Sequence, residues 1–129
     1  MPISDVLAKK YIYKETLAFE AGWLQAEFPK SFENLLLTQV KDESMEPTLR
    51  AGDLILVDTN SRDLEDIEHG VYMFKLDDRI LIKRLQYHAG KILRVLSDNS
   101  AYEAFSIEMT GKSSGLSIMG KVVWCGHKL

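Results

Sequence analysis

The sequence is poor in several features that would assign it to a particular class of protein. Its 129 residues include one cysteine, Cys125, so an internal disulfide framework is excluded. No apolar run approaches the roughly 20 residues that a transmembrane helix needs. The first residues lack the basic and then apolar plan of a secretory signal. We therefore expect a cytoplasmic protein with no membrane partner.

Positive charge is also scarce. The formal net charge is −3, and adjacent basic residues occur only at Lys9-Lys10 and Lys83-Arg84. This balance argues against a surface that binds nucleic acid mainly through its phosphates. The stretch 125–127, Cys-Gly-His, has no second pair at metal-ligand spacing, so we expect no metal and no cofactor.

Apolar residues, in contrast, recur at strand length through most of the chain. The length suits one domain with its own core. The runs that predict strands are 35–40, 54–58, 71–76, 79–85, 91–96, 102–107 and 116–125. The dipeptide Asp77-Asp78 between two of them predicts a hairpin, and Gly120 predicts a bulge. The predicted fold class is mainly β, with largely antiparallel strands and a short N-terminal helix.

The helix is predicted near the beginning of the chain. Aromatic and leucine side chains between residues 17 and 28 follow the helical period, and Pro29 ends the pattern. We expect this amphipathic helix to pack on the sheet. Residues 1–16 show no clear period and are expected to form an arm or linker remnant, so that the domain proper comprises residues 17–129.

The connection 41–53, between the first two predicted strands, contains a serine three residues before a proline, Ser44 and Pro47. A serine at a strand exit, where a helical turn begins, has unpaired backbone N–H groups beside it. Ser44 is therefore either a nucleophile or merely the cap of that turn. The residues around it do not decide between these interpretations.

Lys83 does not fit its predicted strand. Because strand side chains alternate between faces, Lys83 shares a face with Leu81 and Leu85. It either extends to solvent from the rim of the sheet or is desolvated, which would lower its pKa and make it a general base. The strand pattern alone favours the first alternative. The three histidines have no obvious acidic partner, so no Ser-His-Asp triad is indicated.

Several motifs together resemble the LexA-type self-cleaving repressor and UmuD family. Its serine motif resembles residues 44–49 followed by 52–58, and its lysine motif resembles 82–85 at the expected order and distance. Further similarity lies in 97–99 with Tyr102, in 118–124, and in 17–24, which is similar to the segment preceding the catalytic domain of phage-type repressors. The resemblance covers roughly residues 17–125.

The resemblance implies a LexA-like C-terminal domain with a Ser-Lys peptidase site. Ser44 would be the nucleophile and Lys83 the general base, with the backbone N–H groups of Ser44 and Met45 as the oxyanion site. The substrate would be the protein's own N-terminal segment. The family also implies a homodimer, cleavage triggered by RecA bound to single-stranded DNA as in the SOS response, and operator DNA bound by a domain absent from this chain.

This chain departs from the family at the two residues before the serine. The family usually has Gly-Asp or Gly-Met there, whereas this chain has Asp42-Glu43. Asp42 is expected to change the local backbone, and Glu43 to alter the protonation of the dyad. The bond Ala21-Gly22 matches the family's cleavage preference but lies inside the predicted helix. We therefore expect the scissile bond and a DNA-binding domain to precede residue 1 in a longer parent protein.

The leading functional prediction is the autoproteolysis and dimerisation domain of a phage-type or stress-response transcriptional repressor. One alternative is a UmuD-like accessory protein that trims its own arm and then binds a DNA polymerase. Another is a dimerisation module whose dyad is an inactive fossil. A helix-turn-helix encoded upstream in the parent gene would favour the repressor.

Overall fold

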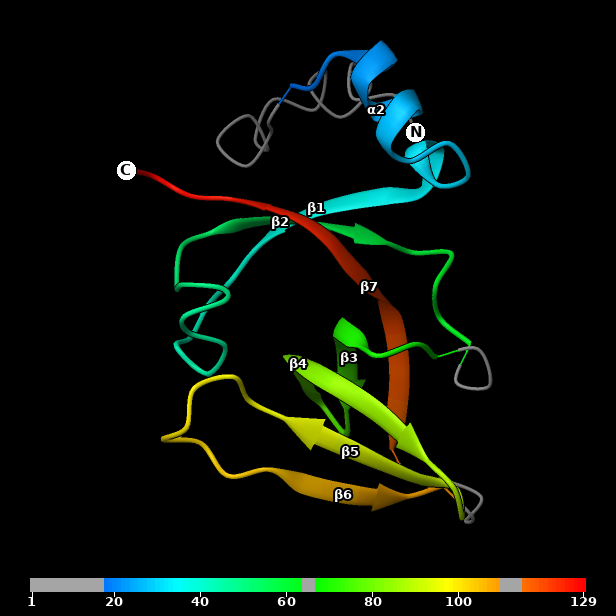
Figure 1. The fold of residues 1–129 in the computed structure, drawn as a ribbon, viewed down its shortest axis with the longest axis vertical. Coiled ribbons are helices and arrows are strands. Elements are labelled where there is room, and N and C mark those ends of the chain that lie inside the picture. The colour runs from blue at the N-terminus through cyan, green and yellow to red at the C-terminus, as the bar shows by residue number, and fades with distance from the viewer. Residues whose placement is uncertain (1–17, 64–66, 110–114) are drawn as a thin grey trace.

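The computed structural model describes residues 18–63, 67–109 and 115–129, which form a strongly bent antiparallel sheet with one short α-helix (Figure 1). The strands are β1 (Leu35–Gln39), β2 (Leu54–Asp58), β3 (Gly70–Leu76), β4 (Arg79–His88), β5 (Ile92–Leu96), β6 (Phe105–Glu108) and β7 (Leu116–Gly126). Their order in the sheet is β1-β2-β7-β3-β4-β5-β6. The predicted fold class is confirmed. The arm predicted for residues 1–16 lies outside the described residues.

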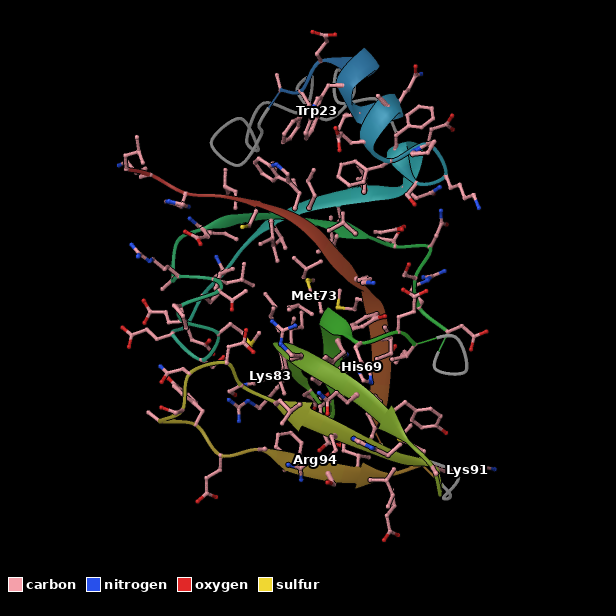
Figure 2. The ribbon with its side chains drawn as sticks, viewed as in Figure 1. Trp23, His69, Met73, Lys83, Lys91 and Arg94 are labelled. Carbon is pink, nitrogen blue, oxygen red and sulfur yellow. The ribbon has the colours of Figure 1, made fainter. Side chains whose placement is uncertain are left out.

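The helix, α2 (Ala21–Glu27), is shorter than the predicted range of 17–28. The chain is extended at Glu20 and leaves the helical conformation at Phe28, and residue 17 lies outside the described part of the chain. Trp23 packs edge-to-face on Trp124 of β7, with ring centroids 6.5 Å apart. Figure 2 shows Trp23 on the side of α2 that faces the sheet. Aromatic contacts thus attach the helix to the sheet, as its amphipathic pattern predicts.

The strand predictions hold, with shifted ends. β3 and β4 form the predicted hairpin, with Leu76 paired to Arg79 across the two-residue turn. β6 begins at Phe105 and not at the predicted residue 102. The reason lies in Asn99, which accepts hydrogen bonds from the backbone N–H groups of Ala101 (3.0 Å) and Tyr102 (3.0 Å) and folds this segment into a turn.

β7 crosses the centre of the sheet and pairs with both β2 and β3. Its register with β3 shifts between Gly120 and Ile118, so the residue between them forms a bulge beside the glycine that predicted one. A Cβ atom at Gly120 would lie 2.5 Å from the carbonyl oxygen of Asp58. Glycine is required here because the two backbones approach so closely.

The buried core consists of two hydrophobic clusters. The first consists of Val40, Met45, Leu49, Ile55, Val57 and Met73, and the second of Tyr72, Phe74, Leu85, Leu93, Val95 and Ile118. Met45 and Leu49 belong to the β1–β2 connection and are 1% and 3% exposed. Their burial anchors this connection, so Ser44 lies on a segment fixed by the core.

Within the described residues, no helix combines the length and the apolar character needed to cross a membrane.

Besides Ala21-Gly22, two more Ala-Gly pairs occur in the sequence. They lie at 51–52 and 89–90, where the chain turns between strands.

Candidate active site

Ser44 lies where the β1–β2 connection begins a tight turn. The turn is closed by backbone hydrogen bonds from Glu46 N to Glu43 O (3.2 Å) and from Leu49 N to Met45 O (2.9 Å). Within the described residues, the Ser44 hydroxyl donates to Asp42 Oδ1 at 2.8 Å and accepts no hydrogen bond from an N–H group of the turn, so it does not act as a cap. Ser44 is only 1% exposed. The capping interpretation is therefore wrong for the conformation described.

Lys83 lies on β4, on the side that the β1–β2 connection and the loop after β5 also occupy (Figure 2). Lys83 is only 8% exposed. The prediction that the strand pattern favoured, in which its side chain extends to solvent from the rim of the sheet, is therefore wrong. Lys83 Nζ donates a hydrogen bond to Ser97 Oγ at 2.8 Å and lies 5.2 Å from the centroid of the Tyr102 ring. The sequence motifs indicated Ser97 and Tyr102 as family matches without giving them a role.

Burial lowers the pKa of Lys83 because it disfavours the charged ammonium. The negative charge of Asp42 acts in the opposite direction, and the positive charge of Arg79 lowers the pKa further. The net result is a pKa below the ordinary value for lysine, as a general base requires.

The loop after β5 joins the serine segment to the lysine strand. Asn99 donates from its backbone N–H to Ser44 O and from its side-chain Nδ2 to Glu43 O, both at 3.0 Å. Ser97, two residues before Asn99 on the same loop, accepts the hydrogen bond from Lys83 Nζ. A single short loop therefore contacts both candidate residues.

An ion pair secures the same loop. Arg84 donates from Nε and Nη2 to the two carboxylate oxygens of Asp98, at 2.9 and 2.7 Å. Asp98 also accepts a hydrogen bond from the hydroxyl of Thr48 in the β1–β2 connection. The hydrogen bond from Arg84 lowers the pKa of Asp98, against a smaller opposing effect of burial. Asp98 thus ties β4 to the serine-bearing connection.

Asp42 contacts Ser44 twice. Its Oδ1 accepts from the backbone N–H of Ser44 at 3.0 Å and from the hydroxyl at 2.8 Å. Burial acts to raise the pKa of Asp42, but the hydrogen bonds from Ser44, with the charges of Lys83 and Arg79, outweigh it and lower the pKa. The side chain that reaches Ser44 thus belongs to Asp42, whereas Glu43 was the residue expected to alter the protonation of the dyad. The tendency of aspartate to bond the backbone amide two residues later is the signal that predicts this contact.

The structure brings Ser44 and Lys83 into one cluster, in which Asp42 influences both. Within the described residues, the hydrogen bond of the Ser44 hydroxyl goes to Asp42 and that of Lys83 Nζ to Ser97. The Met45 side chain is buried in the first core cluster, and its sulfur accepts from Asp98 N at 3.5 Å. In the same described part of the chain, no three His, Cys, Asp or Glu side chains are grouped so that they could hold a metal ion.

Two comparisons with known proteins bear on this cluster. Residues 4–123 match the family described as Peptidase S24-like. The chain is also similar to the 26 kDa repressor protein of Escherichia phage HK022, with 35% identity over 91 residues. The aligned part is 70% of this chain but 37% of the phage protein, so the chain spans well under half the length of this relative.

Proposed function

Because the chain belongs to the Peptidase S24-like family, we propose that it cleaves a peptide bond of its own polypeptide, with Ser44 as the nucleophile and Lys83 as the general base. The observation that carries the proposal is the burial of Lys83, at 8% exposed, in a cluster that also contains Ser44. A buried lysine with a lowered pKa can supply a neutral amine, which an exposed lysine cannot at neutral pH.

The proposed reaction has two steps. In the first, the neutral Lys83 amine takes the Ser44 hydroxyl proton while Oγ bonds to the scissile carbonyl carbon. The C–N bond then breaks, Lys83 gives the proton to the leaving amine, and an ester remains on Ser44. In the second step water attacks the ester, its proton passes through Lys83 to Ser44 Oγ, and a carboxylic acid is released. The backbone N–H groups of Ser44 and Met45 are the proposed oxyanion donors.

The proposed substrate is the protein's own N-terminal segment. Ala21-Gly22 is a poor candidate because it opens α2, and a helical bond has to unwind before it fits a protease site. We therefore propose that the cleaved bond lies elsewhere in that N-terminal segment, outside α2.

The similarity to a phage repressor favours a role in transcription. In this proposal the domain is the C-terminal part of a phage-type or stress-response repressor, it pairs with a second copy, and a separate N-terminal domain binds operator DNA. RecA on single-stranded DNA is the proposed trigger, and self-cleavage would relieve repression by separating the two domains.

The test is self-cleavage of the parent protein, with its native upstream segment, followed by gel and intact mass from pH 7 to 10. We expect the rate to rise with pH as Lys83 loses its proton, and Ser44→Ala and Lys83→Ala each to abolish cleavage. Ser100→Ala and Lys75→Ala are matched controls, because both residues are exposed and outside the cluster. Cleavage that persists in both Ser44→Ala and Lys83→Ala would overturn the proposal.

A further inference from the structure

One oxygen atom of Asp42 receives both polar hydrogens of Ser44. Asp42 Oδ1 lies 3.0 Å from the backbone nitrogen of Ser44 and 2.8 Å from its Oγ. The proposed reaction needs both hydrogens elsewhere. The hydroxyl proton has to pass to Lys83, and the backbone N–H has to face the oxygen of the substrate carbonyl.

The carboxylate of Asp42 contacts one of the two proposed oxyanion donors, the backbone N–H of Ser44. Oxyanion donors lie about 2.7–3.1 Å from the negatively charged oxygen that they stabilise. The distance from Ser44 N to Asp42 Oδ1 falls in this range. A carboxylate oxygen also carries negative charge, so it is an internal substitute for the substrate oxyanion.

We propose that the Asp42 carboxylate occupies the oxyanion site of the resting protein and withholds the Ser44 hydroxyl from Lys83, so that self-cleavage is restrained until the substrate segment displaces it. This inference rests on the function proposed above. It makes Asp42 a positioning residue that acts against the reaction.

The groups around Lys83 show a second effect of the same carboxylate. Ser97 and the Tyr102 ring face Lys83 from the end of β5 and the loop that follows, and Arg79 acts on it from β4 itself. Tyr72 is its partner on β3, with a hydroxyl bonded to the backbone of residue 68. Among the described residues, Asp42 is the carboxylate that raises the pKa of Lys83, whereas Asp98 on the adjoining loop pairs with Arg84. Asp42 therefore also favours the inactive, protonated form of the base.

Displacement, and not protonation, is the way to release this restraint. The pKa of Asp42 is lowered, so the carboxylate stays ionised wherever Lys83 can lose its proton. Asp42 is exposed, whereas Ser44 and Met45 are 1% exposed and fixed by the core. Rotation of one surface side chain therefore clears the site while the backbone of the nucleophile stays in place.

The experiment measures the reactivity of Ser44 without a scissile bond. Diisopropyl fluorophosphate transfers its phosphoryl group to a serine oxygen with loss of hydrogen fluoride, and its P=O oxygen needs the same oxyanion donors. Labelling of this chain is followed by intact mass from pH 6 to 10. We expect Asp42→Asn and Asp42→Gly to raise the rate at pH 7 by about tenfold, since a charge-assisted hydrogen bond no longer has to be broken. The matched control, Glu43→Gln, removes a neighbouring exposed carboxylate and should label like the unaltered chain.

The pH profile separates a specific restraint from general loosening. In Asp42→Asn the midpoint of the rate profile should move to lower pH, and an NMR titration of the Lys83 side chain should move with it. A labelling rate and midpoint unchanged in both Asp42 variants, while labelling still requires Ser44 and Lys83, would overturn the inference alone. A slower rate in Asp42→Asn would overturn it too, because Asp42 would then assist the nucleophile. Labelling that does not require Ser44 would overturn the proposed function itself.

Discussion

Replacing Lys83 with methionine is expected to stabilise the folded domain while abolishing cleavage. Lys83 is 8% exposed, and withdrawing an ammonium from water costs several kcal/mol even after the surrounding protein relaxes. Methionine has a similar length, no charge, and enough flexibility to fill the same space. A merely structural lysine would show the opposite behaviour, because its loss would remove favourable contacts.

The magnitude follows from what the protonated amine gains in the fold. Its hydrogen bond to Ser97 offsets about 1 kcal/mol of the desolvation cost. The Tyr102 ring offsets about 1 kcal/mol more, and the exposed carboxylate of Asp42 less than about 1 kcal/mol. A net penalty of about 1–2 kcal/mol remains, which methionine would relieve. For a domain of this size that gain raises Tm by roughly 4–8 °C.

The assay is urea unfolding of the unaltered chain and of Lys83→Met at pH 7 and at higher pH. The pKa of Lys83 is lower in the folded than in the unfolded chain. Between the two pKa values the unfolded chain therefore binds more protons, and the unaltered protein gains stability as the pH rises through this window. The advantage of Lys83→Met should be full below the folded pKa and shrink across the window.

Lys75→Met is the control, because Lys75 is an exposed lysine on the neighbouring strand β3. It should change the free energy of unfolding little, and equally at each pH. The reasoning would be refuted if Lys83→Met were less stable than the unaltered chain at pH 7, or if its stability difference did not vary with pH.

Two further predictions concern Asp98, on the loop after β5, and Gly120, in β7. Asp98→Asn should lower the free energy of unfolding by about 1 kcal/mol at neutral pH, since Arg84 is partly solvated. Because the pKa of Asp98 is depressed in the fold, its contribution is present above the unfolded value and is lost as the pH falls through the folded value. The two proteins should therefore converge in acid unfolding experiments, and a constant difference would contradict the ion pair. Gly120→Ala should destabilise by about 1–3 kcal/mol in thermal unfolding, since its Cβ would meet the Asp58 carbonyl oxygen. The matched control is Gly90→Ala, where a Cβ atom meets nothing within 4 Å. Its only strain comes from the positive φ of 82°, so it should lower the stability less.

The sequence predicted the strands well because apolar runs and turn residues are local signals. The Asp77-Asp78 turn and the bulge beside Gly120 lie where short-range chemistry requires them. The helix was predicted too long because its aromatic residues outside Ala21–Glu27 still follow the helical period. Phe19, for example, lies before the helix and stacks on Trp23 with ring centroids 5.5 Å apart.

The candidate site was harder to predict because its geometry depends on contacts between distant segments. Alternation places Lys83 on a face but does not say what covers that face. The cover comes from Ser97 and Tyr102, which follow the next strand. Asp42 was expected to act through the backbone, but its contacts with Ser44 are made by its side chain. A local preference for hydrogen bonding would have indicated these contacts.

The division of the interior into two hydrophobic clusters has a consequence for how this chemistry can be tuned. Ser44 is carried by residues of the first cluster, whereas Lys83 is flanked by residues of the second. β3 and β7 join the two halves at the bend (Figure 1). The relative position of Ser44 and Lys83 therefore depends on the bend of the sheet as well as on the loop after β5. If the proposed reaction takes place, substitutions at the bulge of β7 should change its rate from a distance, without altering any group that takes part in it.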